Sequence, residues 1–188
     1  MPNLSNPTLL IVAVAVIVIA LLAVAWLLGQ QRRRRAHLRE RFGPEYDRTV
    51  TAVGTTGKAE AVLAEREKRV ATYHIRALSP EERARFADAW SRVQAKFVDD
   101  PAAAVTEADR LVNDLMSTRG YPMADFDRRA DDLTVEHAQV VHHYRAAREI
   151  AVRHERNAAS TEELRQALVH YRELFAELLG ESPVRRTA

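Results

Sequence analysis

The side chains that could do chemistry in this chain are seven histidines, a group of aspartates and one glycine-bounded turn. The sequence has no cysteine, which excludes disulfides, thiol catalysis and cysteine-ligated zinc or iron–sulfur centres. No histidine belongs to an H-E-x-x-H pattern, and none has a glutamate three residues before it, as di-iron bundles require. The histidines are His37, His74, His137, His142, His143, His154 and His170.

His137, His142 and His143 follow one another closely enough for helix packing to bring them together, with Tyr144 beside them. One alternative is therefore a membrane-anchored helical enzyme or a metal- or ligand-binding bundle that uses these four side chains. The main prediction is different. We expect exposed or capping histidines, no catalytic residue, no metal and no cofactor.

Two further patterns resemble binding motifs but lack the residue spacing or the ligand residues that those motifs require. Gly54-Thr55-Thr56-Gly57-Lys58 has its glycines too close together for a phosphate loop, and Ala59 stands where a magnesium-binding hydroxyl is needed. The aspartates of residues 125–132 lack a calcium-loop spacing because Arg129 occupies a ligand position. We therefore expect a turn at 54–57 and a solvated surface of paired charges at 125–132.

A charge-free stem precedes all of this chemistry. Residues 1–31 contain no Asp, Glu, Lys, Arg or His, and Leu9–Leu28 is apolar throughout. As a helix, such a run spans about 30 Å, the thickness of a bilayer core. A single lipid-embedded strand would leave its backbone groups unpaired, so the sequence predicts one transmembrane helix over residues 9–28.

The flanks of the stem predict its orientation. The leading tail, residues 1–8, carries only the terminal amine, whereas the trailing side opens with four consecutive arginines. The positive-inside rule then places the tail outside the cell and the remainder in the cytoplasm, anchored to the inner (plasma) membrane. The residues expected at the membrane interface and at anionic lipid headgroups are Trp26, Arg32, Arg33, Arg34, Arg35, Arg39 and Arg41.

A cleaved export signal is the competing interpretation of the stem, since Ala23-Val24-Ala25 offers a small-residue cleavage pattern. It predicts an exported helical domain. Signal peptides carry their positive charges before the apolar run, and here the charges follow it, so the anchor is favoured.

The charge balance of the whole chain is misleading. The 28 basic and 26 acidic side chains give a net charge of +2. Without the cluster Arg32–Arg35, the remaining 24 basic and 26 acidic groups give −2. A body of this charge, with its arginines interleaved among acids, does not favour nucleic-acid binding.

The rest of the chain predicts an all-α protein. We expect a basic juxtamembrane helix over 29–43, a helical connector over 44–78, a bundle of about four main helices over 79–180 and a flexible tail over 181–188. In the connector, Ala59, Val62, Val70 and Tyr73 form the expected apolar stripe.

Caps and apolar spacing define the bundle helices. Ser79 with Glu82 and Ser160 with Glu163 are capping boxes, and Asp100-Pro101 starts a third helix. Thr134 is expected to cap a helix that runs to Arg156. The predicted core consists of Phe86, Trp90, Val93, Phe97, Leu111, Leu115, Tyr144, Ile150, Leu164, Leu168, Tyr171 and Phe175.

Several segments of the body also resemble a known group of proteins. They are LSPEERARFADAWSRVQAKFVDDP (78–101), RGYP (119–122), DF (125–126) and VVHHYRAA (140–147). Together they are similar to a family of uncharacterised actinobacterial single-pass membrane proteins with an arginine cluster and a C-terminal helical domain. The resemblance implies the same anchored layout and supplies no activity, ligand or site residue.

The sequence therefore predicts a membrane-anchored helical domain that acts as a protein-interaction or scaffold module. Its partner is an unknown protein or a second copy of the chain. We expect the loop with Tyr121, Pro122 and Phe126 to face that partner.

Overall fold

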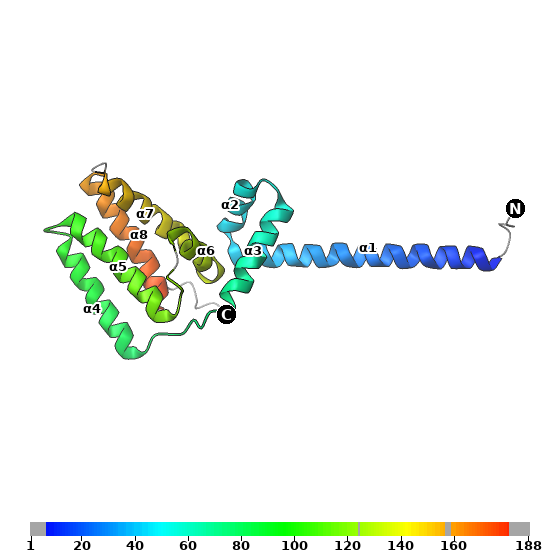
Figure 1. Ribbon diagram of the computed structural model, residues 1–188, viewed down its shortest axis with the longest axis horizontal. Coiled ribbons are helices and arrows are strands. Elements are labelled where there is room, and N and C mark those ends of the chain that lie inside the picture. The colour runs from blue at the N-terminus through cyan, green and yellow to red at the C-terminus, as the bar shows by residue number, and fades with distance from the viewer. Residues whose placement is uncertain (1–6, 124, 157–158, 181–188) are drawn as a thin grey trace. The chain divides into compact units, whose positions relative to one another are not determined.

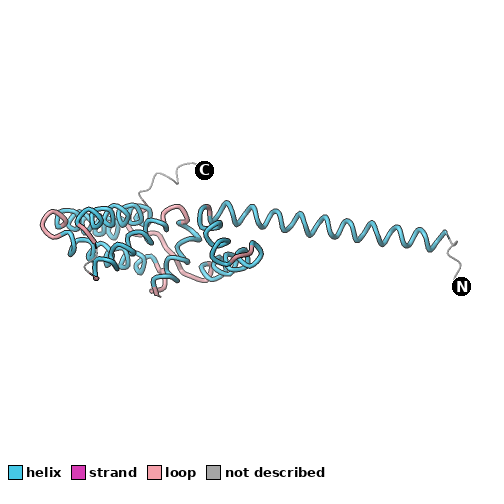
Figure 2. The backbone as a smooth tube through the Cα atoms, turned by 90° about the horizontal axis from the view of Figure 1, so that it is seen from above, coloured by secondary structure: helices cyan, strands magenta, loops and turns pink. Residues whose placement is uncertain are grey.

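The computed structural model describes residues 7–123, 125–156 and 159–180, and the side chains from residue 11 onward. Figures 1 and 2 show these residues as helices joined by loops, with no strand among them. The eight helices are α1 (Pro7–Phe42), α2 (Pro44–Val53), α3 (Thr56–Val70), α4 (Pro80–Lys96), α5 (Pro101–Arg119), α6 (Phe126–His137), α7 (Val141–Glu155) and α8 (Thr161–Leu179). The all-α prediction is confirmed.

The chain divides into two compact units, residues 1–40 and residues 41–188, the second called the body below. In the first unit, α1 is helical from Pro7, and its large apolar side chains from Ile11 to Leu28 are exposed. Within the described residues, one helical segment, Ile11–Phe42, is long and apolar enough to cross a bilayer by length and composition. Most of the predicted outer tail and the tail 181–188 lie outside the described residues.

Side-chain caps fix where the body helices begin. Ser79 Oγ accepts from the N–H of Glu82 at 3.2 Å, and the Glu82 carboxylate accepts from the N–H of Ser79 at 2.9 Å. Ser160 and Glu163 repeat this pair at the start of α8, and Asp100 caps α5. The predicted starts of these three helices are confirmed, because each cap satisfies N–H groups that the first turn leaves unpaired.

Glycine ends α5 for a steric reason. Gly120 has φ +97°, and a Cβ there would collide with the carbonyl oxygen of His74. The same close approach lets the N–H of Arg76 donate to the carbonyl of Arg119 at 2.9 Å. The connector after α3 is thereby fastened to the end of α5.

The main core lies among α4, α5, α7 and α8, which run side by side in Figure 1, with α6 contributing from one end. Trp90 and Phe175 stack across it with their ring centroids 4.7 Å apart. All twelve predicted core residues belong to it, although Phe97, Leu111 and Leu168 are only partly buried. Leu78, Ala130 and Leu133 also belong to this core and were not expected there.

The region between α5 and α8 corrects one prediction. Asp125 caps α6 by accepting from the N–H of Arg128, so the helix begins well before Thr134, which is fully buried inside it. The chain then turns at residues 138–140 before α7 begins. The helix expected from Thr134 to Arg156 is thus divided between α6 and α7. The described part of residues 79–180 contains five helices, and four of them, α4, α5, α7 and α8, surround the core.

The hairpin of α2 and α3 lies outside this core. Its buried apolar side chains include Tyr46, Leu63 and Val70, none of which belongs to the main core. The predicted stripe of α3 was partly wrong: Leu63 is fully buried, whereas Val62 is 38% exposed. Contacts of α3 with α6 join this hairpin to the bundle.

The Trp90–Phe175 stack provides a stability test. Trp90→Ala should lower the free energy of unfolding by about 3–5 kcal/mol, because it removes a large buried side chain and leaves a cavity. Urea unfolding of the full chain in detergent micelles, followed by far-UV circular dichroism, measures the change. The control Val98→Ala alters a side chain that is 84% exposed and should shift stability by less than about 0.5 kcal/mol. Equal effects of the two substitutions would contradict the assigned core.

Candidate functional site

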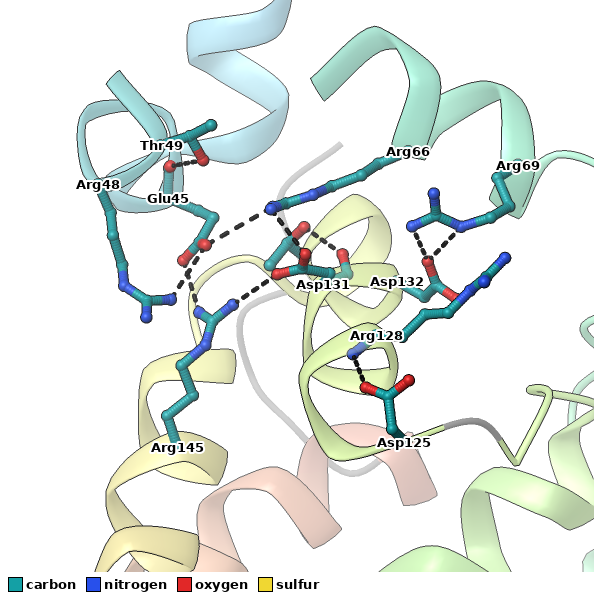
Figure 3. A network of polar contacts seen from close by, with 11 residues as sticks. Glu45, Arg48, Thr49, Arg66, Arg69, Asp125, Arg128, Asp131, Asp132 and Arg145 are labelled. Carbon is teal, nitrogen blue, oxygen red and sulfur yellow. Dashed lines mark hydrogen bonds and ion pairs between the residues drawn. The ribbon is translucent and has the colours of Figure 1, made fainter. Parts of the chain in front are cut away.

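Four charged side chains from four helices meet where the α2–α3 hairpin joins the bundle (Figure 3). Arg145 of α7 donates to Glu45 of α2 at 2.7 Å and to Asp131 of α6 at 3.0 Å. Arg66 of α3 lies 2.8 Å from the other oxygen of Asp131 and 3.6 Å from Glu45. Each guanidinium thus bridges both carboxylates, and we call this group the ion ring.

Three of the four side chains in the ion ring are largely removed from water, and the fourth, Asp131, is 33% exposed. The side chains of Glu45, Arg66 and Arg145 are 8%, 11% and 18% exposed. Burial raises the pKa of Asp131, and the neighbouring Arg66 and Arg145 oppose that shift. Burial likewise lowers the pKa of Arg66. Two positive groups thus pair with two negative groups, and the exposed Arg48 adds a further guanidinium 3.3 Å from Glu45. Pairing is the condition under which buried charges are tolerated.

A second buried carboxylate reinforces this junction. Asp132 of α6 is 2% exposed. Its Oδ1 accepts from Arg69 Nε at 2.9 Å, and its Oδ2 accepts from the Tyr73 hydroxyl at 2.8 Å. The expectation of a solvated surface at 125–132 was therefore wrong for Asp131 and Asp132, which hold α6 to α3, whereas Asp125 is a helix cap.

His137 lies at a different place, in a cavity of about 160 Å³ near the end of α8. Its Nδ1 is 3.0 Å from Glu177 Oε1, and its Nε2 is 3.5 Å from Arg119 Nη1. A guanidinium only donates, so Nε2 accepts and Nδ1–H donates to Glu177. Arg119 also donates to the carbonyl of Leu178 at 3.2 Å. These contacts join the ends of α5, α6 and α8.

The other two candidate histidines are elsewhere. The rings of His142 and His143 lie against each other with centroids 3.9 Å apart and a tilt of 38°, and His143 also contacts His170 of α8. The Tyr144 hydroxyl donates to Asn113 at 3.2 Å within the core. Helix packing therefore brings His142 and His143 to His170, which was not expected, while His137 contacts Glu177 and Arg119. In the described part of the chain, no three His, Cys, Asp or Glu side chains are arranged to hold a metal ion.

The loop predicted to face a partner is packed largely into the body. Tyr121 is 3% exposed, and its hydroxyl donates to Glu136 at 2.9 Å. Phe126 is half-buried, with its ring centroid 4.7 Å from that of Tyr144. Pro122 and the neighbouring Met123 are exposed. The partner-facing role stays a prediction, and Pro122 is the exposed member of the three.

The predicted membrane-interface residues are accessible. Trp26 is 66% exposed, and Arg32–Arg35, Arg39 and Arg41 are exposed as well. Arg41 Nε lies 3.3 Å from Glu67 Oε1 within the body. Lipid contact by these side chains stays a prediction.

Sequence reasoning missed the ion ring because its members are far apart in the chain. Glu45 and Arg145 are 100 residues apart, and their contact depends on the packing of α2 against the bundle. A buried carboxylate has no sequence signal of its own. The residue that pairs with such a carboxylate can be identified only from the relative positions of the helices in the tertiary structure.

Comparison of the chain with protein-family models, with curated proteins and with solved structures found no match.

Removal of one arginine tests the ion ring. Arg145→Met should lower the free energy of unfolding by about 3 kcal/mol, because it removes the hydrogen bonds that Arg145 donates to Glu45 and Asp131. Urea unfolding of the full chain in detergent measures the loss. The control is Arg165→Met, which breaks an ion pair with Glu162 whose side chains are 56% and 59% exposed. That change should leave the urea midpoint nearly unchanged, because an exposed ion pair is screened by water. Similar values for both variants would mean that the ring does not support the fold.

Proposed function

We propose that this protein is a single-pass membrane protein whose helical body lies in the cytoplasm and acts as a protein-interaction or scaffold module. The observation that carries the proposal is the exposed apolar surface of α1. From Ile11 to Leu28 every large apolar side chain is exposed. Water is a poor solvent for a continuous apolar helix of this length, whereas a bilayer core satisfies it.

The charges beside the stem support the orientation. Arg32–Arg35 follow three residues after the apolar stretch, and residues 1–8 carry no charged side chain. Transfer of four guanidinium groups across a bilayer is costly, so the N-terminus would be the end that crosses. The arginines would then lie at the cytoplasmic leaflet, where anionic headgroups attract them by about 1 kcal/mol each.

The body itself supports a binding role. The two helix-starting serines, Ser79 and Ser160, are engaged in capping boxes. The buried His137 hydrogen-bonds Glu177 across helix ends, and the buried Tyr171 hydroxyl donates to Asp109 at 2.8 Å. These groups hold helices together. The charged outer surface is what remains for recognition by a protein partner or a second copy.

The absence of cysteine allows the topology to be tested without background labelling. In the variant Ser5→Cys, a membrane-impermeant maleimide should label intact cells, because residue 5 precedes the stem. In Val98→Cys, whose site is 84% exposed on the body, labelling should require permeabilised cells.

Labelling of Val98→Cys in intact cells would overturn the cytoplasmic placement. The mass of the mature protein distinguishes the two remaining interpretations. A loss corresponding to residues 1–25 would indicate an exported domain after cleavage, and an intact stem labelled at residue 98 would indicate an inverted anchor.

A photocrosslinking amino acid tests the interaction module. Placed at exposed Pro122 in native membranes, it should give one discrete adduct larger than the monomer, because a bound partner presents a fixed surface. The mass of the adduct distinguishes a second copy from another protein. The same probe at Val98, at the opposite end of α5, is the matched control. A heterogeneous smear at both positions, or no adduct at either, would contradict an interaction surface at this loop.

A further inference from the structure

Three histidine rings gather where α7 and α8 pack together. His143 Nδ1 and His170 Nδ1 are 2.8 Å apart, and the His142 ring lies tilted against that of His143. His142 is exposed, while His143 and His170 are half-buried. Tyr144 and Tyr171, the residues next to the paired histidines, are fully buried in the core, so the two helix backbones hold this pair in register.

The short nitrogen–nitrogen separation restricts protonation. One proton can be shared between two Nδ1 atoms at this distance, but two protons would point at each other. Burial, followed by the neighbouring histidines, lowers the pKa of His143, and burial followed by His142 lowers the pKa of His170. Glu173 opposes both shifts without reversing them. The lowered pKa values of both rings favour their uncharged form, the form in which imidazole binds metals.

The same separation suits two ligands of one metal ion. Imidazole nitrogen lies about 2.0–2.1 Å from a bound first-row divalent ion, so two such ligands at a right angle are about 2.9 Å apart. This value matches the observed 2.8 Å. A tetrahedral ion would require a wider spacing of about 3.4 Å. The pair therefore favours the tetragonal or octahedral coordination of Cu²⁺ and Ni²⁺ over that of Zn²⁺.

We propose that His143 and His170 form a two-histidine site for a late first-row divalent cation of the Cu²⁺ or Ni²⁺ type. The proton shared between the two Nδ1 atoms moves to Nε2 of its own ring, so that both Nδ1 lone pairs bind the ion, and water fills the remaining coordination positions. The site lies at the surface, so the ion enters from solvent. Its ligands come from two helices, so binding clamps α7 to α8 and stabilises the folded body by mass action.

Calorimetric titration of the full chain in non-ionic detergent at pH 7.5, with Ni²⁺ alone as the probe, tests the site. The unmodified chain should bind one ion. His143→Gln and His170→Gln should each weaken this binding at least tenfold, because one nitrogen ligand is lost. The controls His154→Gln and His142→Gln should keep it, since neither ring belongs to the facing pair. Binding of the unmodified chain should also weaken at pH 5.5, where protons compete for the rings.

A second measurement separates ligand loss from misfolding. Ni²⁺ should raise the midpoint of thermal unfolding of the unmodified chain and of His154→Gln, but not of His143→Gln or His170→Gln. Far-UV circular dichroism checks that all variants are helical before titration. Binding that is unchanged in both ligand variants would overturn the proposal. An equal loss in His142→Gln would overturn the assignment to this pair.

Discussion

The packing of the α2–α3 hairpin against α6 and α7 depends on the pairing of the four charged side chains in the ion ring. Glu45 and Asp131 lie between the guanidinium groups of Arg66 and Arg145, with Glu45 8% exposed and Asp131 33% exposed. A buried carboxylate without a partner costs several kcal/mol, so the arrangement of α2, α3, α6 and α7 that pairs all four charges is favoured. Apolar packing is compatible with many relative arrangements of the helices, whereas the ion ring is compatible with few of them.

The ion ring also separates two kinds of attachment within the body. The walls of the bundle are joined by close-packed side chains such as Trp90 and Phe175, whose burial needs no particular partner chemistry. The α2–α3 hairpin is joined to α6 by Arg66, Arg69 and Tyr73 on the carboxylates of Asp131 and Asp132. Charged contacts specify position more than they add stability. The hairpin is thereby held in one register on a bundle that packs by itself.

The histidines illustrate how one residue type serves different ends. His137 contacts Glu177 and Arg119, and these contacts join the ends of α5, α6 and α8. His143 and His170 face each other near the surface, at the site proposed to bind a divalent ion. If the stem lies in a bilayer as proposed, both arrangements belong to the part of the chain that meets the cytoplasm. The stem and its arginines would then hold the protein at the membrane, and the body would bind the protein partner.

The sequence alone determined where a helix begins when a neighbouring side chain caps its first turn. Ser79, Asp100 and Ser160 mark helix starts because their side chains satisfy backbone groups within three residues, and the apolar spacing of α4, α5 and α8 identifies the core face. The break between α6 and α7 has no glycine or proline to announce it, so it depended on tertiary packing. The ion ring and the His143–His170 pair were likewise decided by the tertiary structure. Their members lie on different helices, and the relative rotation of packed helices is a property of the whole core.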